Sequence, residues 1–102
     1  MGKHRDHLQI IANILSVVNK GAKKTCIMLK ANLSYKLLNQ YLSEILRANL
    51  ICENGNGSFG ITGKGCMFLR LYYDYDKKYK EFEEQIPHLE KDKKVLERIL
   101  VE

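Results

Sequence analysis

The sequence has no pair of cysteines close enough to form a site, and it has no long hydrophobic run. Its three cysteines, Cys26, Cys52 and Cys66, are odd in number and too widely spaced for a metal knuckle or a redox pair. They are expected to stay reduced and to act as small apolar side chains. The most apolar early run, IIANILSVV, is interrupted by Asn13 and Ser16 and is too short to span a membrane. Without a visible signal peptide, these absences predict a cytoplasmic protein with no membrane partner.

The sequence also lacks a recognisable set of catalytic or metal-binding residues. His4, His7 and His88 are scattered, and none has a carboxylate or cysteine at a spacing typical of a site. The glycine-rich stretch NGNGSFGITGKG resembles a phosphate-binding loop only superficially, because its Gly-Lys is followed by Gly instead of Ser or Thr. We therefore expect no enzyme activity, no metal and no cofactor.

Acidic residues are scarce in the first two thirds of the chain. Residues 1–69 carry nine Lys or Arg and three Asp or Glu, a net charge of +6, whereas residues 70–102 carry eight cations and nine anions. A basic head joined to a nearly neutral tail favours an anionic polymer as partner. Lys3 and Arg5 form an N-terminal arm, for which an added phosphate contact and no role at all both remain open.

Helical spacing of apolar residues marks three short helices in the head. Asp6 is a suitable N-cap for a first helix that runs to about Lys20, and Gly21 suits the left-handed position that follows. A second helix, with no clear N-cap, is expected in KKTCIMLKA, residues 23–31. In that helix, Cys26, Ile27 and either Leu29 or Lys30 divide the inner and outer faces. The apolar face of the first helix comprises Leu8, Ile11, Ile14, Leu15 and Val18.

The third helix is expected to run from Tyr35 to Asn49, with Ser34 as its N-cap. After it, LICEN is expected to form a strand, GNG a tight turn and SFGI a returning strand, and Thr62 can cap a last helix that begins GKGCMFL. The apolar stripe of the third helix comprises Leu38, Tyr41, Leu42, Ile45 and Leu46.

This order of elements predicts a mainly α protein with a small β-hairpin. Three short helices, a two-stranded hairpin and a further helix are typical of a winged helix-turn-helix, in which the second and third helices are joined by a short turn. We expect residues 1–66 to form this DNA-binding domain and residues 67–102 to form a C-terminal coiled-coil helix.

The third helix of such a domain enters the major groove of DNA, where its exposed side chains reach base edges and phosphates. Asn39 and Gln40 can each pair with adenine, Arg47 can contact guanine or phosphate, and Lys36 lies on the first turn, where the helix dipole favours phosphate. The alternative is an ordinary solvated helix face. The predicted DNA-binding residues are Lys23, Lys24, Thr25, Ser34, Tyr35, Lys36, Asn39, Gln40, Ser43 and Arg47.

The predicted wing has no cation. Its turn, ENGNGS, offers Asn54, Asn56 and Ser58 as uncharged donors to phosphate, so we expect a weaker contribution from the wing than is usual.

From Phe68 onward, apolar and aromatic residues recur at alternating steps of four and three, as in a coiled coil. The first half of the series is aromatic and the second half is aliphatic. An antiparallel homodimer centred near Glu84 therefore places large residues against small ones and fills space evenly. A hairpin within one chain would give the same pairs, but the stretch EEQ, where it would have to turn, has no turn residue. The predicted dimer interface, which we call the seam, comprises Phe68, Tyr72, Tyr75, Tyr79, Phe82, Ile86, Leu89, Lys93, Leu96 and Leu100.

The stretch KKTCIMLKANLSYKLLNQYLSEILRANLI, with ITGKG after the wing and a long C-terminal helix, resembles the small archaeal ten-kilodalton winged-helix DNA-binding proteins. The resemblance covers residues 8–68, and beyond them only the architecture matches. It implies a dimer joined by an antiparallel coiled coil and a chromatin-associated or regulatory role on duplex DNA. It also implies DNA contacts at Ser34, Tyr35, Lys36, Asn39 and Gln40. The uncharged wing, the aromatic seam and Pro87 depart from the pattern.

The sequence thus predicts a homodimer that binds double-stranded DNA largely through phosphates, either as a nucleoid-associated protein or as a transcription regulator. The alternative is a winged-helix module that binds another protein. The polar Asn39, Gln40 and Arg47 face argues against this alternative, because interfaces between proteins expose apolar residues at their centres.

Overall fold

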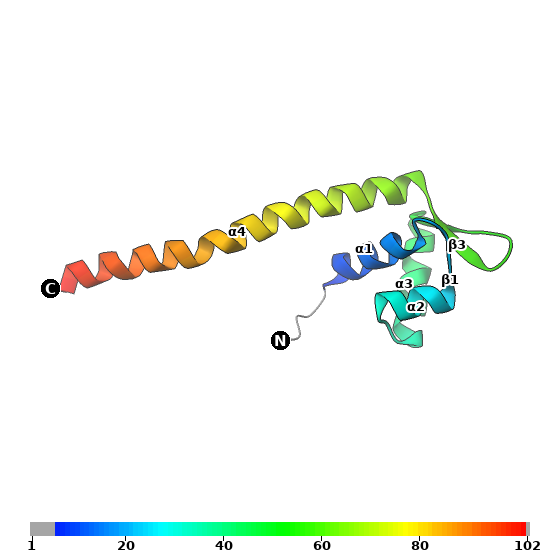
Figure 1. Ribbon diagram of the computed structural model, residues 1–102, viewed down its shortest axis with the longest axis horizontal. Helices are drawn as coiled ribbons and strands as arrows, with labels where there is room; N and C mark the ends of the chain where they lie inside the picture. Colours follow the sequence, from blue (N-terminus) through cyan, green and yellow to red (C-terminus); the bar gives the residue numbers. More distant parts are fainter. Residues whose placement is uncertain (1–5, 102) are drawn as a thin grey trace. The chain divides into compact units, whose positions relative to one another are not determined.

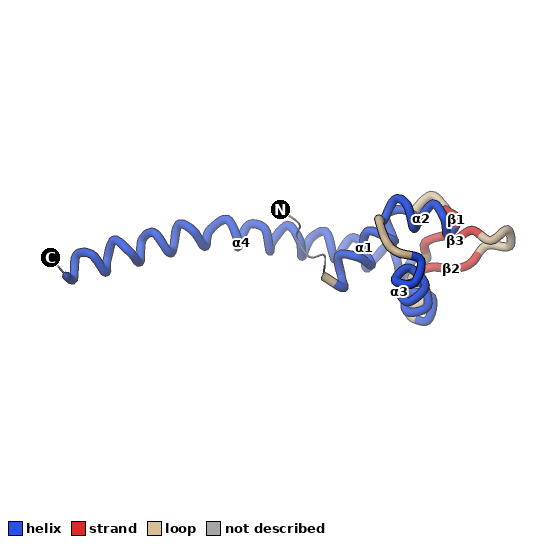
Figure 2. Tube along the Cα trace, turned by 90° about the horizontal axis from the view of Figure 1, so that it is seen from below, coloured by secondary structure: helices blue, strands red, loops and turns tan. Residues whose placement is uncertain are grey.

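The computed structural model describes residues 6–101, which form four helices and a small antiparallel sheet (Figures 1 and 2). Lys3 and Arg5 of the expected N-terminal arm lie outside the described residues. The elements are α1 (His7–Val18), β1 (Ala22–Lys23), α2 (Lys24–Ala31), α3 (Tyr35–Arg47), β2 (Ile51–Glu53), β3 (Ser58–Ile61) and α4 (Gly63–Val101).

The helices begin where local side chains satisfy free backbone donors. Asp6, Ser34 and Thr62 each accept a hydrogen bond from the backbone N–H three residues later, at 2.7, 3.1 and 3.0 Å. These three predicted N-caps are confirmed. Gly21 has the expected positive φ of 84°. The third helix ends at Arg47, earlier than expected, and Asn49 lies in the left-handed region with a φ of 63°.

The sheet has three strands, whereas the sequence predicted a hairpin of two. β1 pairs antiparallel with β3, which also pairs with β2, so β3 is the central strand (Figure 2). The pairs on the added side are Ala22 with Phe59 and Lys23 with Ser58. A strand of two residues is too short to show an alternating pattern, so only its pairing with β3 reveals it.

The core of the head forms where α1, α2 and α3 meet, and the predicted stripes supply most of it. Leu8 was wrongly placed on the inner face of α1: it lies in the first turn and is 42% exposed, and Ile10 is buried instead. In α2 only Ile27 and Ala31 are buried, and Leu29 is 70% exposed because the core covers one side of this short helix. The fully buried large side chains are Ile14, Leu15, Val18, Ile27, Leu38 and Ile45.

The chain divides into two compact units between Tyr72 and Tyr73, and α4 contributes to both. In the first unit, Gly65 of α4 is buried, and Phe68 and Leu69 are half-buried against the core. In the second unit, α4 continues as a single helix through Pro87, which therefore does not end it.

Candidate nucleic-acid interface

The turn between α2 and α3 is short and closely fixed. Asn32 lies in the left-handed region with a φ of 55°, and its backbone N–H bonds back to the end of α2. Leu33 is buried in the core, and the Ser34 hydroxyl caps α3. This helix-turn-helix holds the two helices in a defined orientation, with one face of α3 toward solvent.

The exposed face of α3 carries the predicted polar residues. Leu38, Leu42 and Ile45 turn inward and are buried, and Lys36, Gln40, Ser43 and Arg47, on the opposite side of the helix, are exposed. Within residues 6–101, no carboxylate lies within 4 Å of the charged groups of Lys36 and Arg47. An open depression on this face is lined by Gln40, Ser43, Glu44, Arg47 and Ala48.

Three predicted residues meet at the start of α3. The Lys24 ammonium lies 4.6 Å from the centroid of the Tyr35 ring and 3.5 Å from its hydroxyl oxygen. A hydrogen bond from the Asn39 side chain lowers the pKa of Tyr35, and the hydrogen bond and charge of Lys24 lower it further. Tyr35 remains 63% exposed. The structure therefore groups one cation, one phenol and one amide at the exposed N-terminal end of the third helix.

The structure gives Lys23 two roles that its position in the sequence did not reveal. It occupies the N-cap position of α2 with extended backbone and makes no side-chain capping bond, which accounts for the unclear cap in the sequence. It also belongs to β1, where it pairs with Ser58 at the start of β3. The added strand therefore places one exposed lysine beside the wing. Thr25, the second residue of α2, is exposed as well.

The three predicted wing residues bond to one another. The Ser58 hydroxyl donates to the Asn56 side-chain oxygen at 2.6 Å and accepts from the Asn54 amide at 3.3 Å. The Asn54 backbone N–H also donates to the Ser58 carbonyl at 2.7 Å. These contacts stabilise the turn and occupy donors that the sequence assigned to phosphate.

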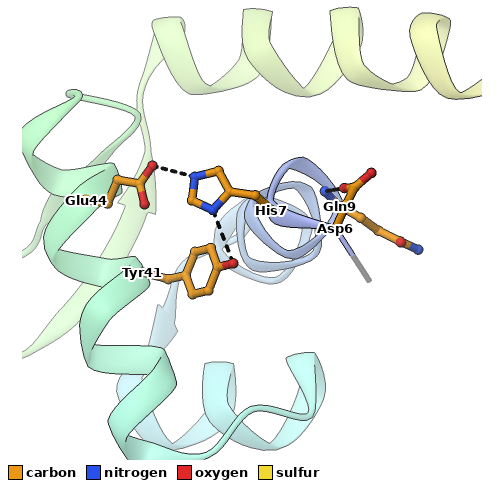
Figure 3. A network of polar contacts seen from close by, with 5 residues as sticks. All are labelled: Asp6, His7, Gln9, Tyr41 and Glu44. Atoms are coloured by element: carbon orange, nitrogen blue, oxygen red, sulfur yellow. Dashed lines mark hydrogen bonds and ion pairs between the residues drawn. The ribbon is translucent and has the colours of Figure 1, made fainter. Parts of the chain in front are cut away.

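Glu44, the only acidic residue of α3, contacts a histidine of α1. Its Oε2 atom lies 2.7 Å from Nε2 of His7, and Nδ1 of the same imidazole lies 3.2 Å from the Tyr41 hydroxyl (Figure 3). The rings of His7 and Tyr41 are 5.2 Å apart. Glu44 lies 37 residues away in the sequence, so no local spacing indicates that it meets His7. Only the packing of α1 against α3 brings the two residues together.

The C-terminal part of the predicted dimer interface is exposed in the single chain. Phe68 packs against the core of the head, and Tyr72 and Ile86 are half-buried. The rings of Tyr75 and Tyr79 lie 6.1 Å apart along α4. Lys93 is exposed and pairs with Glu97 at 3.9 Å. The other interface residues and their exposed fractions are Tyr75 52%, Tyr79 50%, Phe82 58%, Leu89 63%, Leu96 64% and Leu100 85%.

Residues 6–101 contain no cluster of three or more His, Cys, Asp or Glu side chains that could hold a metal ion. In the same part of the chain, no helix has the length and apolar character that a membrane crossing would require.

A protein-family profile described as winged helix-turn-helix matches residues 4–91. The chain belongs to this family. Among solved structures, the chain is similar to Sso10a-2, a DNA-binding protein from Sulfolobus solfataricus, with a TM-score of 0.66 and 18% sequence identity. The alignment covers 83% of this chain and 96% of that one. A search of curated proteins finds no match.

The family match and the shared fold confirm the resemblance to small archaeal winged-helix proteins that the sequence suggested. They also confirm the predicted fold class, a mainly helical winged helix-turn-helix with a long C-terminal helix.

Proposed function

We propose that this protein is a non-enzymatic, homodimeric duplex-DNA-binding protein whose α3 enters the major groove. The observation that carries the proposal is the charge of the exposed α3 face. Lys36 and Arg47 face solvent, whereas Glu44, the one anion of this helix, is held by His7. Family membership and the DNA-binding description of the structural neighbour support the same function.

The remaining groups on this face suit DNA chemically. The amides of Asn39 and Gln40 match the donor and acceptor pattern of adenine in the major groove, and Lys36, Arg47 and Lys24 match phosphate. Ser34, Tyr35, Ser43 and Thr25 add uncharged donors, and Lys23 offers the wing side a cation that the turn lacks. The polar character of this face does not favour a protein partner.

The test is a fluorescence-anisotropy titration of duplex DNA with the double variant Lys36→Glu and Arg47→Glu. The matched control is Lys20→Glu with Lys30→Glu, which makes the same change in net charge at two exposed positions outside α3. We expect the α3 variant to lose binding and the control to keep most of it. Equal binding by the two variants contradicts the assignment of α3. Affinity of the unaltered protein should also fall steeply as salt rises, because phosphate contacts release counterions.

We further propose that α4 pairs with α4 of a second copy. Tyr79, Phe82, Leu89 and Leu96 are each at least half exposed on one face of the second unit, and exposed apolar rows of this kind mark an interaction surface. An antiparallel pair centred near Glu84 sets Tyr79 against Leu89 and Phe82 against Ile86, with Tyr72 against Leu96 and Tyr75 against Lys93.

The dimer is tested by light scattering on Tyr79→Asp, with Tyr73→Asp as the matched control. Tyr79 lies on the seam and Tyr73 does not, although both are about half exposed. We expect the mass of a monomer for the first variant and of a dimer for the second. An unchanged mass for Tyr79→Asp contradicts the seam.

Chain direction is tested with spin labels attached through Gln85→Cys or Arg98→Cys, after the three natural cysteines have been replaced by serine. In an antiparallel pair the two labels at position 85 lie close together. Those at position 98 are about 40 Å apart, from a rise of 1.5 Å per residue. Short distances at both positions contradict the antiparallel arrangement.

The proposed role is chromatin association or transcription regulation in the compartment that holds the chromosome. These two roles differ in the ratio of specific to non-specific affinity. A gel shift that compares selected genomic fragments with random duplex at two salt concentrations measures this ratio directly. A regulator is expected to prefer its selected fragments strongly, and an architectural protein is not.

A further inference from the structure

The second unit of the chain is close to neutral in total charge, but its charges are sorted onto different faces of α4. On the side away from the apolar seam, positions 73, 77, 80, 84, 87, 91, 94, 98 and 101 form one strip along the helix, and positions 74, 81, 88 and 95 lie beside this strip. Only one position of the strip carries an acid, Glu84, although residues 73–101 contain eight acids in all. We call the five cations of the strip the basic stripe: Lys77, Lys80, Lys91, Lys94 and Arg98.

The acids of this unit lie to the sides of the basic stripe. Asp76, Glu83, Glu90 and Glu97 recur every seven residues on one flank of the seam, about 100° around the helix from positions 77, 84, 91 and 98. Asp74 and Glu81 lie on the other side of the stripe. The strip itself therefore carries five positive charges and one negative charge, although the net charge of the tail is close to zero.

Among the residues that the structure describes, most cations of the stripe have no ion pair in their own helix. Lys78 pairs with Asp74 at 3.1 Å and Lys93 pairs with Glu97 at 3.9 Å, but neither lysine belongs to the stripe. Among residues 6–101, the one ion pair of the stripe is that of Lys80 with Asp76 at 3.0 Å. Within residues 6–101, no carboxylate lies within 4 Å of the charged groups of the other four cations.

We propose that the basic stripe is a second contact surface for the phosphates of duplex DNA. The stripe extends over 22 residues from Lys77 to Arg98, and the 21 steps between them span about 32 Å at 1.5 Å per residue, close to the 34 Å repeat of B-DNA. Lysine side chains act as flexible point charges, so they hold a phosphate backbone without reading bases. The surface adds non-specific affinity to the base reading proposed for α3.

The chemistry of the face favours DNA over the other partners of a basic surface. A helix that lies on a membrane inserts the apolar face opposite its cations into the lipid, and here the second copy is taken to cover that apolar face. A protein interface has an apolar or aromatic centre, and the centre of this face holds Glu84 and Pro87. The inference rests on the proposed function, because the seam opposite the stripe is taken to be covered by the second copy.

The test moves charges off the stripe without changing the net charge. The stripe variant combines Glu90→Lys, Lys91→Glu, Glu97→Lys and Arg98→Glu, which exchange neighbouring residues on the flank and on the stripe. The matched control, Asp74→Lys with Lys78→Asp, reverses an ion pair beside the stripe. Circular dichroism and light scattering first verify that both variants keep the helicity and mass of the unaltered protein.

Anisotropy titrations with duplex DNA are then run at several salt concentrations. We expect the stripe variant to bind about tenfold more weakly at low salt, and the control to bind as the unaltered protein does. The salt slope of the stripe variant should be smaller by about 0.9 for each phosphate that it no longer neutralises. Equal affinity and slope for the two variants overturn the inference.

The α3 variant Lys36→Glu with Arg47→Glu separates this inference from the proposed function. If that variant loses binding and the stripe variant does not, the inference fails and the function stands. If the stripe variant loses binding and the α3 variant does not, the assignment of α3 fails and the stripe stands. No binding by the unaltered protein overturns both.

A second measurement uses the unaltered protein and needs no folded variant. Lysines are acetylated with and without bound duplex, and the modified peptides are quantified by mass spectrometry. We expect DNA to protect Lys77, Lys91 and Lys94 and to leave Lys78 reactive. Equal reactivity of the three stripe lysines in the two samples overturns the inference.

Discussion

The carbonyl oxygen of Leu50 occupies the space that a β-carbon on Gly65 would need, and that β-carbon would also lie 2.7 Å from Cγ1 of Ile61. The first turn of α4 therefore approaches the backbone before β2 more closely than any side chain allows. We expect Gly65→Ala to push these segments apart and to lower the free energy of unfolding by about 1–3 kcal/mol, measured by chemical denaturation.

The control for this prediction is Gly63→Ala, in the same turn of α4. A β-carbon on Gly63 would meet no atom within 4 Å, and alanine favours a helix more than glycine does. Its free energy of unfolding should stay the same or rise slightly. Equal losses in the two variants would show that the close approach to Leu50 is not the cause.

Two neighbouring apolar residues of α2 should differ sharply when truncated. Ile27 is fully buried and Leu29 is 70% exposed. Ile27→Ala leaves a cavity and is expected to cost about 2–5 kcal/mol, whereas Leu29→Ala is expected to change stability by less than about 0.5 kcal/mol. Urea denaturation of both variants measures the difference, and a large loss from Leu29→Ala would contradict the placement of α2.

The N-cap of α3 should contribute measurably to stability. The Ser34 hydroxyl accepts the Leu37 backbone N–H at 3.1 Å, so Ser34→Ala is expected to cost about 1 kcal/mol in thermal or chemical unfolding. Ser43→Ala is the control, because Ser43 lies on the exposed face of the same helix, away from its ends. A similar cost at both positions would rule out capping as the explanation.

Ionisation of Tyr35 should depend on its neighbours. Hydrogen bonds from Asn39 and Lys24, together with the Lys24 charge, lower its pKa in the folded chain relative to the unfolded chain. These contacts therefore add stability at pH values above the unfolded pKa, and that stability is lost as the pH falls through the folded pKa. Lys24→Met should raise the pKa of Tyr35, and Lys23→Met should not.

The measurement for Tyr35 is an alkaline titration followed by NMR of carbon-13-labelled tyrosine, with the resonance assigned through a Tyr35→Phe variant. The same ionisation midpoint in the unaltered protein and in Lys24→Met would refute a contribution from Lys24. Double replacement of Lys24 and Asn39 should give the largest upward shift.

The sequence by itself determined those features that depend on interactions between near neighbours. Three helix caps, Asp6, Ser34 and Thr62, accept hydrogen bonds from backbone N–H groups three residues later in the chain. Gly21 takes a left-handed backbone conformation that few other residues tolerate. The apolar stripe of α3 follows from helical spacing alone. These interactions join residues that are close together in the sequence, so the order of the helices, the wing and the long C-terminal helix could be predicted.

Only the tertiary structure decided which distant residues meet. β1 exists because Ala22 and Lys23 pair with β3, and two residues carry no period of their own. His7 finds Glu44 across 37 residues, and Gly65 must be small because of Leu50. Leu8 and Leu29 have the apolar character of core residues, yet they face away from the packed side of their helices. Burial depends on what covers a face, and no short stretch of sequence records that.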